Sequence, residues 1–314
     1  MTQENLRYDQ TPMKITGKME VAKLRITRAA IIGTLSLIAT TLAIGGCASH
    51  GGTASGKWSS DQPIDQLTLL QEAADHEALY TLAGGLKPMS SGFWHTSFVV
   101  DDPDLRELHK VQEMLEVLQN EAWYADVQIF EKIHDGERNA HAFVVHRNSL
   151  KRMIDRHESF WSAWEITPDT HPTAIVEIVD RMPREDRWRG YGYLYGYPDE
   201  AVDFFVEAGV AADDGREMGP GKDRQFMQIP TYAAESGRFT YAVPLEHVPT
   251  PADQALKARS NRILKAYKER RPHIHDLDDM IETMLQFNDQ FAEQSMIERI
   301  DFVAPMNDAV QSSS

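Results

Sequence analysis

Residues 123–146 read WYADVQIFEKIHDGERNAHAFVVH, and this stretch decides the fold that the sequence predicts. β-Branched and aromatic residues are concentrated in its two halves, as is typical of strands. Asp135-Gly136 stands between the halves and is a dipeptide that favours a tight hairpin turn. We therefore expect two antiparallel strands, Trp123 to Ile133 and Ala140 to His146.

Other extended and helical patterns lie on both sides of this hairpin. A further strand is expected from Thr96 to Val100, and a second hairpin from Gln225 to Ala233 and Arg238 to Leu245. Caps and first-turn prolines predict helices that begin near Asp61, Asp102, Asn148, Thr170, Pro198 and Thr250, and a last helix carries Met280 to Phe287. With a tyrosine-rich strand described below, the pattern predicts a single α+β domain over residues 63–300. It has a largely antiparallel sheet of about six strands and six or more helices.

The amino-terminal part of the chain carries a different signal. Residues 29–47 read AAIIGTLSLIATTLAIGGC and follow three basic residues, Lys23, Arg25 and Arg28. A basic segment, an apolar core and small residues before a cleavage point are the parts of a secretory signal peptide. The last four residues, Ile44-Gly45-Gly46-Cys47, resemble the lipobox of bacterial lipoproteins. The resemblance implies that residues 1–46 are removed and that Cys47 receives a diacylglycerol and becomes the mature amino terminus.

An uncleaved signal anchor is the alternative, because residues 29–48 are about long enough to cross a bilayer as a helix. Both interpretations carry the residues after Cys47 across the membrane, since the basic residues precede the apolar run. Acylation also gives a role to the only cysteine of the chain, which has no partner for an internal disulfide. Because the leader is long for a signal peptide, we expect translation to start at Met13 or Met19.

Composition limits the partners of the exported part. The chain has a net charge of −16, and the removed segment takes away more basic than acidic residues. Because nucleic acids bind clustered Lys and Arg, an acidic surface argues against a nucleic-acid partner. Membrane attachment is therefore expected through the acyl chains on Cys47, followed by a flexible tether over residues 47–62 and, at the other end, a frayed tail over 301–314. Ala48 is not aspartate, which by resemblance to enterobacterial sorting favours the outer membrane.

The most unusual stretch of the exported part is GYGYLYGY, residues 190–197. As a strand it places Tyr191, Tyr193, Tyr195 and Tyr197 on one face and three glycines on the other. Tyrosine rings with polar tips stack on sugars or form adaptable protein contacts, so this face is a candidate ligand platform. The alternative is that the rings pack under a helix with their hydroxyls at the rim.

Three further places are candidates for chemistry. His273 and His275 point the same way on an extended segment and, with Asp278, are candidate ligands of a zinc-like ion, although polar residues are also expected beside a helix start. His157 lies within an apolar helical stripe. It is either a core residue, as is usual for a histidine in such a position, or a catalytic one. The loop from Gly84 to Gly92 is either a loose anion cradle or, as we prefer, a helix end followed by a turn. No cofactor motif is present, and no catalytic residue is singled out.

The sequence thus predicts a lipid-anchored protein of the bacterial cell envelope that faces the periplasm or the exterior. A binding or scaffold role is the leading expectation, with a glycan or an envelope protein as partner. The rival is a periplasmic hydrolase that uses histidine and carboxylate groups near Tyr197 to Glu200 or near His273 to Asp278, with or without a metal.

Overall fold

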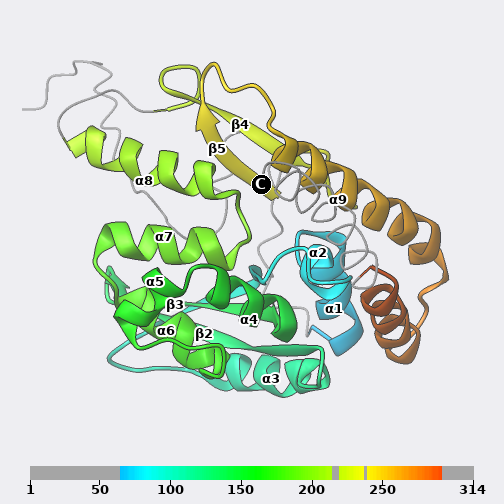
Figure 1. Ribbon diagram of the computed structural model, residues 1–314. Helices are drawn as coiled ribbons and strands as arrows, with labels where there is room; N and C mark the ends of the chain where they lie inside the picture. The colour runs from blue at the N-terminus through cyan, green and yellow to red at the C-terminus, as the bar shows by residue number, and fades with distance from the viewer. Residues whose placement is uncertain (1–63, 214–218, 237–238, 292–314) are drawn as a thin grey trace, which may run out of the picture. The chain divides into compact units, whose positions relative to one another are not determined.

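The computed structural model describes residues 64–213, 219–236 and 239–291 of the chain. The signal peptide, the lipobox with Cys47, the tether and the frayed tail predicted above lie outside the described residues. The strands are β1 (Met89–Val99), β2 (Trp123–His134), β3 (Glu137–His146), β4 (Arg224–Ile229) and β5 (Phe239–Pro244) (Figure 1). The helices are α1 (Gln66–Asp75), α2 (Leu79–Leu82), α3 (Arg106–Leu115), α4 (Arg147–Arg156), α5 (Glu158–Trp161), α6 (Pro172–Arg181), α7 (Arg184–Leu194), α8 (Asp199–Asp213) and α9 (Pro251–Arg270). A last helix covers residues 277–291, and short 3-10 turns cover Glu116–Leu118, Ser162–Trp164 and Arg271–His273. Over the described part of the chain, we find no helix with the length and apolarity needed to span a membrane.

A three-stranded antiparallel sheet in the order β1–β3–β2 is the centre of the fold. The hairpin predicted from residues 123–146 is confirmed as β2 and β3. Its turn residues Asp135 and Gly136 have φ angles of 50° and 84°, as a two-residue hairpin turn requires. The predicted strand from Thr96 is also present, but β1 begins earlier, at Met89.

Helices cover both faces of this sheet. On one face, Trp123, Ala142 and Val144 belong to a hydrophobic cluster with residues of α1, α2, α3, α9 and the last helix. On the other face, Phe143 and Val145 cluster with residues of α4, α6 and α7. The alternation of β3 explains this division, because successive side chains point to opposite faces of a strand.

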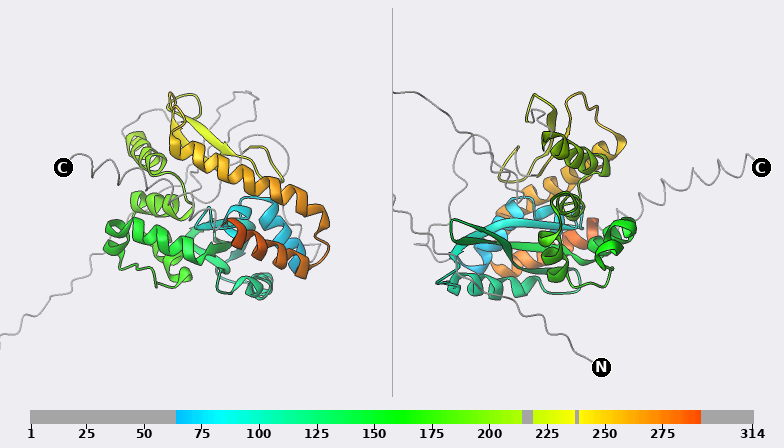
Figure 2. Two further views of the ribbon diagram at one scale, coloured as in Figure 1. Left: turned by 45° about the vertical axis from the view of Figure 1, so that its right-hand side comes forward. Right: turned by 90° about the vertical axis from the view of Figure 1, so that its left-hand side faces the viewer.

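The second predicted hairpin is confirmed as β4 and β5, which form a separate two-stranded sheet. Ala201 of α8 packs with Tyr241 and Val243 of β5, and Leu256 of α9 packs against the same group. Figure 2 shows α9 running beside this hairpin. The cap predicted at Thr250 is present as well, since Thr250 and Asp253 form a capping box at the start of α9.

The α+β class is therefore correct, but the prediction of one sheet of about six strands is wrong. The described residues contain a three-stranded and a two-stranded sheet. The missing strand is the tyrosine-rich stretch, whose residues 190–194 form the end of helix α7. Its glycines permit close helix packing: a Cβ on Gly190 would lie 3.1 Å from Val179 of α6, and one on Gly192 would lie 2.7 Å from Val202 of α8. Tertiary packing thus overrides the alternating pattern, which alone is typical of a strand.

Three helices also differ from the prediction. The helix expected near Asp102 is α3, which begins at Arg106. The first helix of the chain begins after Asp65, whose side chain accepts a hydrogen bond from the Thr68 amide at 2.8 Å, and not near Asp61. It is interrupted after Asp75, so that α1 and α2 replace one continuous helix. The helix expected to carry His157 within its apolar stripe ends before that residue, because His157 is the carboxyl-terminal cap of α4.

Candidate functional site at the junction of helices α7 and α8

The two glycine-rich stretches that the sequence singles out, residues 84–92 and 190–197, meet in the structure. Gly196, between α7 and α8, has a φ angle of 70°, and a Cβ at this position would lie 2.8 Å from the ring of Pro88. Only glycine combines this left-handed backbone with so close an approach. We define the α7–α8 junction as residues 193–199 and the Lys87 loop as residues 84–92. The Lys87 loop lies on one side of the junction, and α4 lies on the other.

The Lys87 side of the junction holds a buried ion pair. The ammonium group of Lys87 has no exposed surface and lies 2.6 Å from Glu77 Oε2. It also lies 5.3 Å from the ring centre of Tyr195 and 4.6 Å from that of Phe239. Aromatic faces attract cations, and the attraction grows when the cation is removed from water. One carboxylate and two rings thus replace the hydration shell of Lys87.

Hydroxyl groups surround the start of β1 beside this ion pair. Ser91 Oγ and Tyr195 Oη share a hydrogen bond of 3.0 Å. Ser90 Oγ donates to the carbonyl oxygen of Glu77 at 3.3 Å and also lies 2.9 Å from Thr81 Oγ1. These bonds hold the loop against the segment that carries Glu77, because each buried hydroxyl requires a partner.

The opposite side of the junction holds a histidine and a carboxylate. His157 Nε2 lies 3.4 Å from Asp199 Oδ1, and its ring stacks on Tyr193 with centres 3.8 Å apart and planes inclined by 10°. The side chain of His157 is 14% exposed and that of Asp199 is 40% exposed. Solvent therefore reaches this pair, in contrast to Lys87.

Arginine side chains complete the second side. Arg156 donates to Asp199 Oδ2 at 2.7 Å, and Arg189 forms hydrogen bonds with Tyr193 Oη and Asp203. Burial lowers the pKa of His157, and the charge of Asp199 opposes part of that shift. His157 is therefore held mainly in its neutral form near neutral pH.

This second side has the components of a general acid–base pair. A neutral imidazole accepts a proton through one nitrogen while a carboxylate at the other nitrogen orients the ring and stabilises its charged form. The stacked Tyr193 ring fixes the orientation further. The first side, in contrast, is closed, because the Lys87 ammonium group is paired with Glu77 and fully covered.

The four tyrosines do not form the predicted platform. Tyr191 and Tyr193 are buried, and Tyr195 and Tyr197 are half-buried. Tyr191 Oη accepts a hydrogen bond from Gln128 Nε2 at 2.8 Å, under the sheet face that α7 covers. Because α7 is a helix, Tyr191 and Tyr195 are stacked neighbours one turn apart, with ring centres 5.8 Å apart. The structure agrees with the alternative in which the rings pack against protein.

The predicted metal ligands are not assembled. His273, His275 and Asp278 are exposed or nearly so, and no group of three His, Cys, Asp or Glu side chains in the described ranges is arranged to hold an ion. The carboxylates nearby serve the last helix instead: Asp276 accepts from the Asp279 amide at 2.9 Å, and Asp279 accepts from the His275 amide at 3.1 Å. The alternative of polar residues beside a helix start is the one observed.

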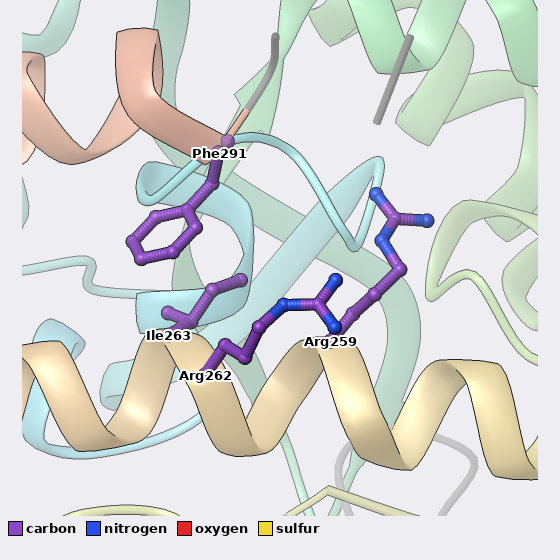
Figure 3. A pocket seen from close by; sticks show the side chains of 5 residues that line it. Arg259, Arg262, Ile263 and Phe291 are labelled. Carbon is purple, nitrogen blue, oxygen red and sulfur yellow. The ribbon is translucent and has the colours of Figure 1, made fainter. Parts of the chain in front are cut away.

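A small cavity lies at the other end of the Lys87 loop (Figure 3). It is lined by Gly84, by Arg259, Arg262 and Ile263 of α9, and by Phe291 of the last helix, and its volume is about 10 Å³. That is room for about one water molecule. The preferred interpretation of the loop as a helix end is confirmed, since α2 ends at Leu82 and Gly84 and Gly85 have positive φ angles.

The comparison with known proteins adds no homologue: the chain matches no protein-family model, no curated protein and no solved structure. A function can therefore be inferred only from the sequence and structure of the chain itself. The sequence indicates Asp199, within the range Tyr197 to Glu200, as a carboxylate near a functional site, but it does not indicate His157 as its partner. It gives no signal for the pair of Lys87 and Glu77, because nothing in the local pattern indicates that this lysine is buried.

Proposed function

We propose that this chain is a lipid-anchored protein of the bacterial cell envelope. The proposal rests on one observation, the only cysteine of the chain at the end of an apolar run in the sequence Ile44-Gly45-Gly46-Cys47, after three basic residues. The acyl groups on Cys47 hold the protein at the membrane, and the α+β domain faces the periplasm or the exterior. Ala48 favours the outer membrane over the inner one.

The test compares the wild-type protein with Cys47→Ser, both extracted from their native membranes. Intact mass and partitioning into detergent are measured. A chain that begins at Cys47 with added acyl mass, both lost in Cys47→Ser, supports the proposal. A chain that retains residues 29–46 identifies a signal anchor and overturns the lipid part.

Within this setting we propose a binding or scaffold role with an envelope protein as partner. Two exposed apolar side chains of β2, Ile129 and Ile133, support it, because they lie on one face of the sheet beyond its covered part. Their side chains are 39% and 49% exposed. Phe98 on β1 lies across the same face, opposite Arg138, which in turn faces Ile133. Apolar groups gathered at one end of a sheet are typical of protein contact surfaces.

A photo-crosslinking residue at position 133 tests this role in intact cells. The matched control is the same residue at Leu285, an exposed apolar position on the last helix. We expect one defined crosslinked protein from position 133 and none from position 285. Equal crosslinking from both positions, or none from position 133, would count against the surface.

The second candidate function is a hydrolase, and the observation that favours it is the pair of His157 and Asp199. A panel of chromogenic esters and amides tests the purified full chain. The hydrolase requires that His157→Gln and Asp199→Asn both abolish turnover while the exposed neighbour variant Glu158→Gln keeps it. Activity that survives His157→Gln would exclude this site.

A further inference from the structure

Outside the α7–α8 junction, three polar residues stand in one row across the sheet. His95 of β1 is the partner of His141 of β3, and His141 is the partner of Gln128 of β2. Partners in adjacent strands lie on the same face, with their Cβ atoms about 5 Å apart. This is the face of Phe143, which α7 covers only in part, since His95 is exposed and His141 is half-buried.

Irregular strand pairing shapes the surroundings of His141. Residues 92–94 of β1 stand opposite a single residue of β3, and residues 130–132 of β2 do the same. Gly92, in the first irregularity, has a φ angle of 83° and would carry a Cβ 3.9 Å from His141 Nδ1. In the second, Phe130 packs edge-on against His141 with ring centres 4.8 Å apart. Bulges of this kind re-aim side chains, and here they leave His141 between Phe130 and His95.

The two imidazole rings are close enough to share one ion. Their centres lie 5.9 Å apart and their planes are inclined by 68°. Two histidines on a tetrahedral ion, with metal–nitrogen distances of about 2.1 Å, place their ring centres roughly 5 Å apart. A small rotation of the exposed His95 side chain closes that difference, since its ring is not enclosed by the core.

The protonation state of His141 also suits a metal ligand, and the third residue of the row is a buried amide. Burial lowers the pKa of His141 to about 4, with a smaller contribution from His95, so its ring is neutral at neutral pH. A neutral imidazole is the form that binds metal ions. Gln128 is 3% exposed, and its Oε1 has no hydrogen-bond partner among the described residues. An unsatisfied buried oxygen in the same row is unusual, because such groups normally have a partner.

We propose that His95 and His141 bind a divalent transition-metal ion, Zn²⁺ or Cu²⁺, at the surface of the three-stranded sheet. Imidazole nitrogen is a preferred ligand of both ions. Water completes the coordination, because no third His, Cys, Asp or Glu side chain joins the pair in the part of the chain that the structure describes. The site is distinct from His273, His275 and Asp278 and independent of the proposed anchoring.

Binding is tested on the full chain with Cu²⁺ and Zn²⁺ added separately. The electron paramagnetic resonance spectrum of one equivalent of Cu²⁺ should show coupling to two imidazole nitrogens. The Zn²⁺-dependent rise in the midpoint of thermal unfolding should be present in the wild type and lost in His95→Ala. Because His95 is exposed, this substitution should not impair folding. His109→Ala is the matched control, because His109 is an exposed histidine on α3.

The outcomes separate the proposal from ordinary surface binding. Retention of the nitrogen couplings and of the thermal shift in His95→Ala would overturn it, as would equal losses in His95→Ala and His109→Ala. His141→Gln gives a second reading, in which the nitrogen couplings fall to those of a single imidazole. No response of the wild type to either metal would also overturn the proposal.

Discussion

Lys87 and Glu77 form an ion pair with a nitrogen–oxygen distance of 2.6 Å, in which only the carboxylate reaches solvent. The side chain of Lys87 has no exposed surface, whereas that of Glu77 is 17% exposed. The pair is therefore asymmetric: a carboxylate that loses its partner regains some water, and an ammonium group that loses its partner does not. The cost of an unpaired buried charge makes this difference measurable.

The first prediction concerns this asymmetry. Glu77→Gln keeps the shape of the side chain but leaves a buried cation, so it should lower the free energy of unfolding by about 3–5 kcal/mol. Lys87→Met leaves an apolar chain between Tyr195 and Phe239 and a partly hydrated carboxylate, so its loss should be smaller. Urea unfolding of both variants and of the double variant measures the effects. The double variant should be more stable than Glu77→Gln, and equal losses in the two single variants would contradict the argument.

The second prediction concerns the contact between α7 and α8. A Cβ on Gly209 would lie 2.1 Å from Trp188 Cζ3. Helix propensity alone predicts that Gly209→Ala stabilises α8 by about 1 kcal/mol. Because Trp188 must move, we expect destabilisation by about 1–3 kcal/mol instead.

Two variants control for this effect in the same unfolding assay. Ala211→Gly, in the same helix, should cost about 1 kcal/mol through propensity alone. Adding Trp188→Leu to Gly209→Ala should recover part of the loss by removing the ring. A Gly209→Ala variant more stable than the wild type would show that the helices separate at little cost.

The parts of the fold that local patterns specify were predicted from the sequence. The β2–β3 hairpin was found because Asp135-Gly136 requires positive φ angles, and α9 because Thr250 and Asp253 form its cap. The alternation of Tyr and Gly in the tyrosine stretch predicts a strand. What makes it a helix is the close contact of Gly192 with Val202, which belongs to another helix and cannot be seen in the stretch itself.

The candidate site was predictable only in fragments, for a related reason. Asp199 lies within the range from Tyr197 to Glu200 that the sequence offers for a hydrolase site, although the helix dipole alone also favours a carboxylate at a helix start. Its partner His157 caps the end of α4, and their approach depends on how the end of α4 packs against the start of α8. The burial of Lys87 depends on Phe239, far away in the sequence. Periodicity describes one segment at a time, and these contacts join several.

The third prediction concerns the link between α1 and α9. Arg271 donates two hydrogen bonds to Asp75, of 2.7 and 2.8 Å, and Tyr267 Oη lies 2.7 Å from the same carboxylate. Arg271→Lys keeps the charge but not the two-bond geometry, so unfolding free energy should fall by about 1–2 kcal/mol. Asp75→Ala leaves both partners unsatisfied and should cost more. The exposed pair variant Lys151→Ala is the control and should change stability by less than about 0.5 kcal/mol. Equal effects of Arg271→Lys and Lys151→Ala would contradict the prediction.

The fourth prediction concerns stability below neutral pH. Burial lowers the pKa of His141 to about 4 and lowers the pKa of His146 and His157 as well. As pH falls below the ordinary histidine pKa of about 6.5, the unfolded chain binds protons that the folded chain refuses, so stability falls. His141 alone contributes a loss on the order of 3 kcal/mol between about pH 6.5 and pH 4. Asp180 has the opposite effect on stability at the acidic end. Burial raises the pKa of its carboxyl group, so the folded chain binds this proton more readily than the unfolded chain does.

Urea unfolding at pH 7 and pH 5 without metal ions measures this dependence, in a window above most carboxylate titrations. His141→Gln should be less stable than the wild type at pH 7 but should lose less on acidification, since the group that refuses the proton is absent. His109→Ala, which removes an exposed histidine of α3, is the matched control for the loss of one histidine. Wild-type stability that stays constant or rises from pH 7 to pH 5 would mean that the buried histidines accept protons in the folded state.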